Sequence, residues 1–166
     1  MLKLLLNSII LTVVTPIEGS LGSRLRYLYY RWQLKHCGGY FTTGAGFRLM
    51  GCGNISIGRR CSFNNHVWIG ASCGIEIGND VLVGPYVVMR DANHGYADKT
   101  KRIREQDNSK AKITIGDDVW IGAMVVILKG VTVGRGSIVA AHSLVNKDIG
   151  RNTIWGGVPA RFLKER

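Results

Sequence analysis

The stretch ITIGDDVWIGAMVVILKGVTVG, residues 113–134, repeats its pattern every six residues. Ile115, Ile121, Ile127 and Val133 stand six positions apart, and glycine follows most of them. A strict hexapeptide period is typical of a parallel β-helix, in which three short strands form each coil. The repeated apolar residue then points into a triangular prism, and each coil stacks on its neighbours.

The same period extends in both directions from this stretch. Twelve repeats give four coils, which begin at residues 57, 77, 115 and 133, and residues 40–56 are expected to add an irregular first coil. Glycine or another permissive residue accommodates the turns between strands. We therefore predict an all-β chain folded as a parallel β-helix, whose inward positions are Ile57, Phe63, Ile69, Ile77, Val83, Met89, Ile115, Ile121, Ile127, Val133, Val139 and Val145.

Two further segments precede the repeats. Residues 4–14 are strongly apolar, but they are too few to cross a bilayer, and no clear signal-peptidase site follows them. Residues 20–35 predict a helix with Leu21, Leu25, Leu28 and Trp32 on one face and a row of Arg and Lys on another. Such a helix suits a membrane interface, or else it packs on the rest of the protein or at a subunit interface.

These features divide the chain into three parts. Residues 1–39 form an N-terminal helical segment in possible contact with a membrane through residues 1–35, and residues 40–158 form the β-helix domain. Residues 159–166 form a C-terminal cap, for which Pro159 predicts a short helix.

The composition excludes several classes of protein. The net charge of +11 allows binding to nucleic acid, an anionic membrane or phosphate-bearing small molecules, but no nucleic-acid motif appears and we expect no such partner. The four cysteines lack CxxC spacing and are expected to be reduced thiols in a cytosolic protein. Cys61 and Cys73 share the small position of the repeat, which predicts buried side chains.

A long interruption of the repeat marks the expected site. The coil that begins at residue 77 ends at His94, and residues 95–114 are extruded as a loop, which in a compact domain is usually functional. A histidine, with a pKa of about 6.5, can accept the proton of an attacking alcohol at neutral pH. Asp91 can orient the imidazole, hold the loop or contact the acceptor, and no Ser or Cys is evidently placed as a nucleophile.

Residues 54–164 resemble the hexapeptide-repeat acyltransferases, in the branch of galactoside and maltose acetyltransferases and bacterial polysaccharide O-acetyltransferases. The resemblance rests on the stretch 113–134 and on three further stretches, DANHGY at 91–96, IREQ at 103–106 and GGVPARFLK at 156–164. It implies a left-handed β-helix, a homotrimer, and acetyl-CoA as co-substrate, with His94 as the general base.

The same resemblance assigns the cofactor residues. Ala123 and Ala141 are expected to bond the pantetheine arm, and Trp120 to pack along it. Three basic residues are expected to hold the nucleotide end, namely Lys147, Arg161 and Lys164.

The acceptor is less closely defined. Asn64 and Asn65 lie one coil before His94 and can hold sugar hydroxyls. Galactoside-type enzymes carry acidic residues where this sequence has Ala71 and Ser72, so the resemblance does not carry over the identity of the sugar.

We therefore expect an O-acetyltransferase that acts on a sugar or glycan in bacterial surface polysaccharide synthesis, in the cytoplasm or at the inner face of the membrane. Three other readings stay open: an amino-sugar or serine-type acceptor, a non-catalytic β-helix scaffold, and a metalloenzyme of the γ-carbonic-anhydrase kind. The four histidines include no short-spaced pair, and we expect no metal.

Overall fold

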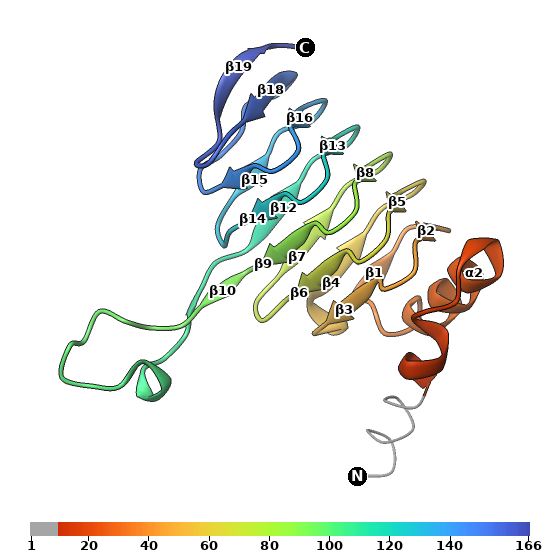
Figure 1. Ribbon diagram of the computed structural model, residues 1–166, viewed down its shortest axis with the longest axis horizontal. Coiled ribbons are helices and arrows are strands. Elements are labelled where there is room, and N and C mark those ends of the chain that lie inside the picture. Colours follow the sequence, from red (N-terminus) through yellow and green to blue (C-terminus); the bar gives the residue numbers. More distant parts are fainter. Residues whose placement is uncertain (1–9) are drawn as a thin grey trace.

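The computed structural model describes residues 10–166, which form a parallel β-helix with a helical segment at one end and a projecting arm (Figure 1). The apolar run at residues 4–14 therefore lies mostly outside the described residues. Each coil contributes one strand to each of three parallel sheets, here called A, B and C in the order in which the chain visits them.

The strands of each sheet follow at regular intervals along the chain. Sheet A contains β1 (His36–Cys37), β4 (Ile55–Ile57), β7 (Ile75–Ile77), β12 (Ile113–Ile115) and β15 (Thr132–Val133). Sheet B contains β2 (Thr42–Thr43), β5 (Ser62–Phe63), β8 (Leu82–Val83), β13 (Trp120–Ile121), β16 (Ile138–Val139), β18 (Thr153–Gly156) and β19 (Arg161–Glu165). Sheet C contains β3 (Arg48–Met50), β6 (Trp68–Gly70), β9 (Val88–Arg90), β14 (Val126–Ile127) and β17 (Leu144–Val145).

The first coil is more regular than its sequence indicates. It begins with β1 and pairs in register with the next coil, so that Cys37 lies beside Ile57, Thr43 beside Phe63 and Leu49 beside Ile69. The repeat is hidden there because Cys37, Thr43 and Leu49 are chemically dissimilar.

The predicted inward residues form the core. All twelve are buried, with exposed fractions of 4% or less, which confirms the register of the repeat. Because each inward side chain lies against those of the coils above and below, the core is a continuous column along the prism.

The repeated glycines allow adjacent coils to approach each other closely. They are not the residues that adopt the left-handed backbone of the turns. A Cβ atom on Gly122 would lie 2.6 Å from the backbone nitrogen of Ala141, closer than real contacts allow. The left-handed backbone falls two positions later and is mostly adopted by other residues, such as Met124 (φ 57°) and His142 (φ 59°). The glycine column therefore sets the distance between coils.

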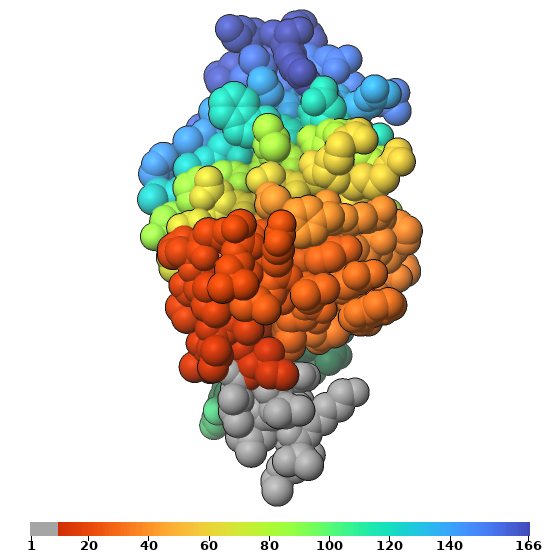
Figure 2. Space-filling view, turned by 90° about the vertical axis from the view of Figure 1, so that its right-hand side faces the viewer, coloured from red at the N-terminus to blue at the C-terminus, as the bar shows by residue number. Residues whose placement is uncertain are grey.

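The helix α2 (Gly19–Tyr30) covers one end of the prism (Figure 2). Its contact face is polar: Arg26 is fully buried and donates hydrogen bonds to the backbone carbonyls of Val14, Thr15, Ile17 and Thr43 and to the Thr43 hydroxyl. Tyr30 packs edge-on against Phe47 beneath the helix.

The apolar stripe predicted for this helix faces away from the prism. Leu21, Leu28 and Trp32 are 63%, 54% and 80% exposed, whereas Leu25, the fourth residue of the stripe, is half-buried. The guanidinium of Arg31 lies 4.5 Å from the centre of the Trp32 ring.

The predicted short C-terminal helix is wrong. Residues Arg161–Glu165 form β19, which pairs antiparallel with β18 at the last rung of sheet B. An isolated segment of this length is too short to be stable as a helix, whereas the open edge of the last rung offers backbone partners.

The extruded loop is an arm that leaves the corner between sheets C and A (Figure 1). Its root is a short antiparallel pair of β10 (Ala92–Asn93) and β11 (Ser109–Lys110), and its far part contains the single turn η2 (Ile103–Glu105). The side-chain amide of Gln106 donates to the carbonyls of Asp98 and Lys101 and holds the arm in shape.

Another prediction needs correction at the same corner. Cys61 is buried, but Cys73 is exposed, because residues 71–74 form a longer turn between β6 and β7 that carries the side chain out of the prism. All four cysteines are free thiols. A second single turn, η1 (Cys52–Asn54), precedes β4.

Candidate functional site

His94 stands directly after β10, at the root of the arm, and is exposed. Among residues 10–166, its imidazole makes no hydrogen bond, so both ring nitrogens are available to a substrate. The β10–β11 pairing fixes the backbone of the preceding residue, Asn93, against Ser109. The pairing thus fixes the backbone just before His94, while the His94 side chain stays free to contact a substrate.

The carboxylate of Asp91 is directed away from His94 and toward the previous coil. It accepts hydrogen bonds from the backbone N–H groups of Ser72 (2.7 Å), Cys73 (2.7 Å) and Gly74 (2.7 Å). Burial raises the pKa of Asp91, but the three N–H donors together outweigh it and hold the pKa below its usual value. Of the roles considered from the sequence, the contacts favour holding the root of the arm over orienting the imidazole.

The turns between sheets B and C form one corner that collects four of the predicted residues. Asn64 and Asn65 follow β5, Ala123 follows β13 and Ala141 follows β16. The backbone N–H of His142 donates to the carbonyl of Ala123 at 2.8 Å and ties these two turns together. The predicted acceptor and cofactor positions therefore share one edge of the prism.

The backbone at this corner has free donors. Within the described part of the chain, the N–H groups of Ala123 and Ala141 have no protein acceptor. Their methyl side chains leave this backbone accessible, and Ala141 is exposed. Free N–H groups beside small side chains can bind an extended amide-bearing chain such as pantetheine.

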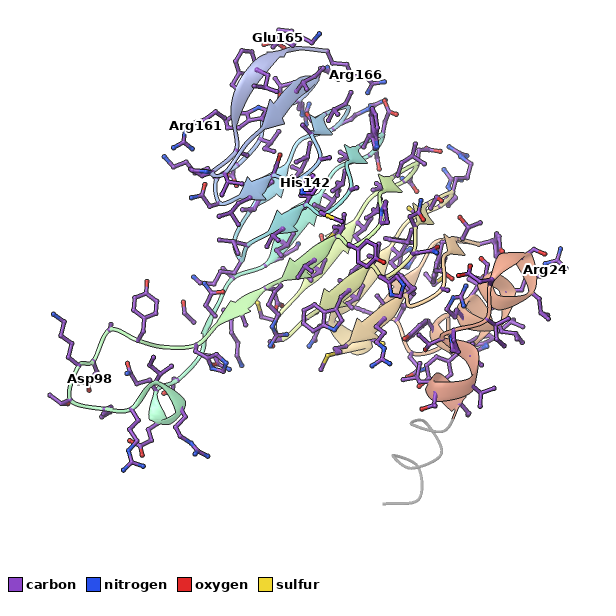
Figure 3. All side chains as sticks on the ribbon, viewed as in Figure 1. Arg24, Asp98, His142, Arg161, Glu165 and Arg166 are labelled. Carbon is purple, nitrogen blue, oxygen red and sulfur yellow. The ribbon has the colours of Figure 1, made fainter. Side chains whose placement is uncertain are left out.

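The remaining predicted cofactor residues lie in two places, on an interior strand of sheet B and at one end of the prism. Trp120 is 53% exposed on the outer face of sheet B, between Leu82 and Ile138 of the neighbouring strands. Lys147, Arg161 and Lys164 are exposed, and Figure 3 shows Arg161 on the side from which the arm projects. These cations lie at the end of the prism farthest from α2.

One chain does not bring the base and the cofactor corner together. His94 leaves the corner between sheets C and A, whereas Ala123 and Ala141 lie at the corner between sheets B and C. The outer face of sheet C separates the two corners.

Comparison with known proteins shows the family to which this chain belongs. The family description "bacterial transferase hexapeptide (six repeats)" matches residues 112–147. An Escherichia coli protein named as a lipopolysaccharide biosynthesis O-acetyl transferase is 34% identical over 136 residues, which cover 75% of this chain and 68% of that protein. The chain belongs to the hexapeptide-repeat acetyltransferases.

Other relatives in the family are matched over a smaller share of their length. Galactoside O-acetyltransferase of Escherichia coli is 38% identical over 112 residues, 68% of this chain and 54% of the relative. The chain thus spans about half the length of this curated relative.

Solved structures of the family match almost the whole chain. A hexapeptide-repeat acetyltransferase from Vibrio cholerae in complex with acetyl-CoA superimposes with a TM-score of 0.83 at 32% identity, over 96% of this chain and 84% of that one. A maltose O-acetyltransferase from Clostridium difficile gives 0.83 at 27% identity, over 96% and 83%.

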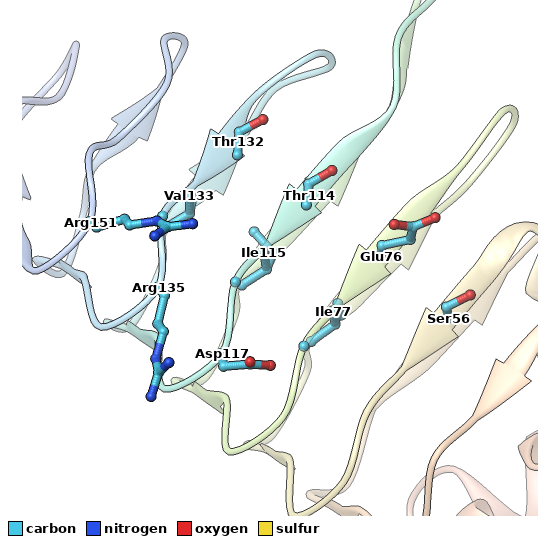
Figure 4. Close-up of a pocket in the computed structure, with 13 residues that line it drawn as sticks. Ser56, Glu76, Ile77, Thr114, Ile115, Asp117, Thr132, Val133, Arg135 and Arg151 are labelled. Atoms are coloured by element: carbon cyan, nitrogen blue, oxygen red, sulfur yellow. The ribbon is translucent and has the colours of Figure 1, made fainter.

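A separate groove runs along the outer face of sheet A (Figure 4). Ser56, Glu76, Thr114 and Thr132 line it from successive strands, and Asp117, Arg135 and Arg151 lie at its edge. Glu76 pairs with Lys112 at 2.6 Å. None of the predicted site residues lines this groove.

Two aromatic residues near the predicted acceptor positions were not selected from the sequence. The ring of Tyr86 stacks on His66 at 4.8 Å, and Trp68 lies on the next strand. His66 and Tyr86 occupy the same position of adjacent coils, a relationship that the repeat spacing could have revealed.

The described residues were also searched for metal-binding groups and for helices that could span a membrane. Between Ile10 and Arg166, no group of three His, Cys, Asp or Glu side chains is placed to hold a metal ion. Over the same range, no helix combines the length and the hydropathy needed to cross a bilayer.

Proposed function

We propose that this protein transfers an acetyl group from acetyl-CoA to a hydroxyl group of a sugar, with His94 as the general base. The observation that supports this most is the exposed, unengaged imidazole of His94 at the root of the arm, in a chain of this family. Relatives named as galactoside and maltose O-acetyltransferases suggest the sugar acceptor.

In the proposed reaction, an imidazole nitrogen of His94 accepts the proton of the sugar hydroxyl while the hydroxyl oxygen attacks the carbonyl carbon of the thioester. The carbon–sulfur bond then breaks, and the imidazolium returns the proton to the departing thiolate of CoA. A free backbone N–H of Ala123 or Ala141 stabilises the negative charge that develops on the thioester oxygen, or it donates to an amide carbonyl of the pantetheine arm. The nucleotide end lies toward the cationic group of Lys147, Arg161 and Lys164.

Direct transfer is favoured over an acyl-enzyme. The exposed thiol nearest to the arm root is Cys73, and desolvation together with the Asp91 carboxylate raises its pKa. A neutral thiol is a poor nucleophile, so Cys73 is not activated for acyl transfer.

We further propose a homotrimer in which each site lies between two copies. The base and the free N–H groups occupy different corners of one prism, so a neighbouring copy must bring its cofactor corner to His94. The trimer itself is the oligomer that the family resemblance implies, and its cyclic symmetry would make the three interfaces and their sites equivalent.

The cellular setting that we propose is surface polysaccharide synthesis at the inner face of the cytoplasmic membrane. The relative named for lipopolysaccharide biosynthesis suggests the pathway. The outward stripe of Leu21, Leu28 and Trp32 supports attachment to a lipid surface, with Arg24 and Arg31 beside it.

His94→Ala tests the catalytic role. Turnover should fall by about 10²–10⁴-fold, the usual contribution of a general base, while acetyl-CoA binding measured by calorimetry stays unchanged. His36→Ala is the matched control, because His36 is also exposed but lies in β1 at the far end of the prism. Wild-type turnover of the His94 variant with every tested sugar would refute the assignment.

The shared site is tested by mixing two inactive variants. Ala141→Trp should block the cofactor corner but leave His94 intact, and His94→Ala should do the reverse. After the two are unfolded and refolded together, about a quarter of the sites should combine one intact half from each chain. Activity that stays at the level of the single variants would show that each chain uses its own two halves.

A further inference from the structure

The outer face of sheet C carries an indole with one guanidinium group against its ring and a second arginine on the adjacent strand. Arg48 and Trp68 are paired on adjacent strands, and Arg90 lies on the next strand, beside Gly70. The Arg90 guanidinium carbon is 5.9 Å from the centre of the Trp68 ring. This face, formed by Arg48, Trp68 and Arg90, is called the sheet C platform below.

Gly70 allows the platform to form. A Cβ atom at this position would lie 2.6 Å from Cη2 of Trp68 and 3.0 Å from Nη1 of Arg90. The indole and the guanidinium therefore converge over a residue that has no side chain. Any larger residue would force them apart.

The two arginines of the platform are unpaired. Within residues 10–166, neither Arg48 nor Arg90 forms an ion pair or a side-chain hydrogen bond. In contrast, Arg60 is paired with Asp80, and Arg166 with Asp118. Two unpaired guanidinium groups beside an aromatic ring are suited to a ligand that combines a negative charge with an apolar ring face.

Two residues of the platform, Arg48 and Trp68, line a groove, whereas Arg90 lies outside it. Arg48, His66 and Trp68 line one side, and Thr12, Thr15, Pro16 and Glu18 of the N-terminal segment line the other. The hydroxyl of Thr15 is buried, and within the described residues it has no hydrogen-bond partner. An unsatisfied buried hydroxyl destabilises the free protein, and a polar ligand at the groove can relieve that cost.

Arg90 is the part of the platform that lies close to the arm, whereas the groove opens at the corner between sheets B and C, where Ala45, Gly46 and His66 line it. Asp91 follows Arg90 directly and starts the arm, so that only three residues separate Arg90 from His94. Four extended steps span at most about 14 Å. A sugar that stacks on Trp68 therefore lies within a short distance of the general base.

We propose that the sheet C platform binds an acceptor sugar that carries a negative charge, either a phosphate or a carboxylate. Arg48 and Arg90 hold the anion, Trp68 stacks on the apolar face of the ring, and the Glu18 carboxylate accepts hydrogen bonds from ring hydroxyls. This inference rests on the proposed acetyl transfer and specifies its substrate class.

The test measures binding and turnover with three probes: glucose 1-phosphate, glucuronate and methyl glucoside. The wild-type protein should bind at least one of the two anionic sugars about tenfold more tightly than the neutral one, measured by calorimetry. The two anionic arms distinguish phosphate from carboxylate.

Variants of the platform give the second measurement. Arg48→Gln with Arg90→Gln should lower the ratio of kcat/KM for the preferred anionic sugar over methyl glucoside by about tenfold or more, as expected when charge-assisted bonds are lost. Arg59→Gln removes an exposed arginine outside the groove and should leave the ratio unchanged. Unfolding temperatures of all variants establish that they remain folded.

The outcomes separate this inference from the proposed function. An unchanged ratio in the double variant, with transfer to sugars intact, overturns the anionic acceptor and leaves acetyl transfer standing. Arginine-dependent binding of an anionic sugar without any acetylation supports the platform and contradicts the proposed function. Equal binding of all three sugars to the wild-type protein also overturns the inference.

Discussion

The carboxylate of Asp91 accepts a hydrogen bond from the backbone N–H of Gly74 at 2.7 Å, across the gap between two coils. Ser72 and Cys73 donate to the same carboxylate. One side chain thus ties the longer turn at residues 71–74 to the coil from which the arm departs. The position of His94 depends on this anchor.

Asp91→Ala should destabilise the protein by about 3 kcal/mol, because three partly buried backbone N–H donors lose their charged acceptor. Catalytic activity should fall as well, since the root of the arm loses its anchor. Urea denaturation gives the stability, and hydrogen exchange at residues 71–74 locates the loss. Asp107→Ala is the control, because Asp107 is exposed in the arm; an equal loss in both variants would contradict the anchoring role.

Acidification should act through the same carboxylate. The pKa of Asp91 is lowered in the folded protein, so its contribution to stability is complete above the unfolded value of about 3.9 and is lost as the pH falls through the folded value. The free energy of unfolding of the wild-type protein should therefore fall more steeply than that of Asp91→Asn below about pH 4. Parallel curves for the two proteins would show that Asp91 does not titrate in this way.

Arg26→Leu should release α2 from the prism. The side chain is fully buried and donates to four carbonyl groups and one hydroxyl, so its removal leaves these acceptors unsatisfied, at a cost of about 3–5 kcal/mol. Thermal unfolding and proteolysis within residues 10–30 measure the effect. Arg24→Leu is the control, because Arg24 lies on the exposed face of the same helix. If both variants unfold at the wild-type temperature, the buried arginine does not fasten the helix.

Gly122→Ala should separate two coils at the cofactor corner. The new methyl group would lie 2.6 Å from the nitrogen of Ala141, and relief of such overpacking typically costs about 1–3 kcal/mol. The unfolding temperature should drop by several degrees, and the KM for acetyl-CoA should rise. Gly53→Ala is the control, because a Cβ atom there meets nothing within 4 Å. A wild-type KM in the Gly122 variant would contradict the placement of the cofactor at this corner.

The outward face of α2 should bind anionic lipid vesicles at low salt. Leu28→Ser with Trp32→Ser should abolish sedimentation with the vesicles, because these side chains supply the exposed apolar area. Ile103→Ser is the control, since Ile103 is 59% exposed but lies in the arm. Wild-type protein that stays in the supernatant, or equal loss in the control, would show that this helix face serves another contact.

The candidate site was predictable only in part from the sequence. His94 was identifiable because the repeat stops there, and Ala123 and Ala141 because the resemblance assigns them. Trp68 and Arg90 were not, because their convergence depends on the missing side chain of Gly70, one strand away from Arg90. The hydrogen-bond donors to the Asp91 carboxylate were not predictable from the sequence either, since the N–H groups of Ser72, Cys73 and Gly74 approach it only when the coils stack.

The sequence by itself determined the β-helix and the register of its core. A six-residue period places an apolar side chain at the inward position of each successive wall, and burial of Ile57 or Ile127 follows from that local periodicity alone. The tertiary structure decided the rest: the strand at Arg161–Glu165, the direction of the exposed stripe on α2, and the separation of His94 from Ala123 and Ala141 on two corners. These depend on which backbone and side-chain groups meet across stacked coils, and such partners lie many residues apart in the chain.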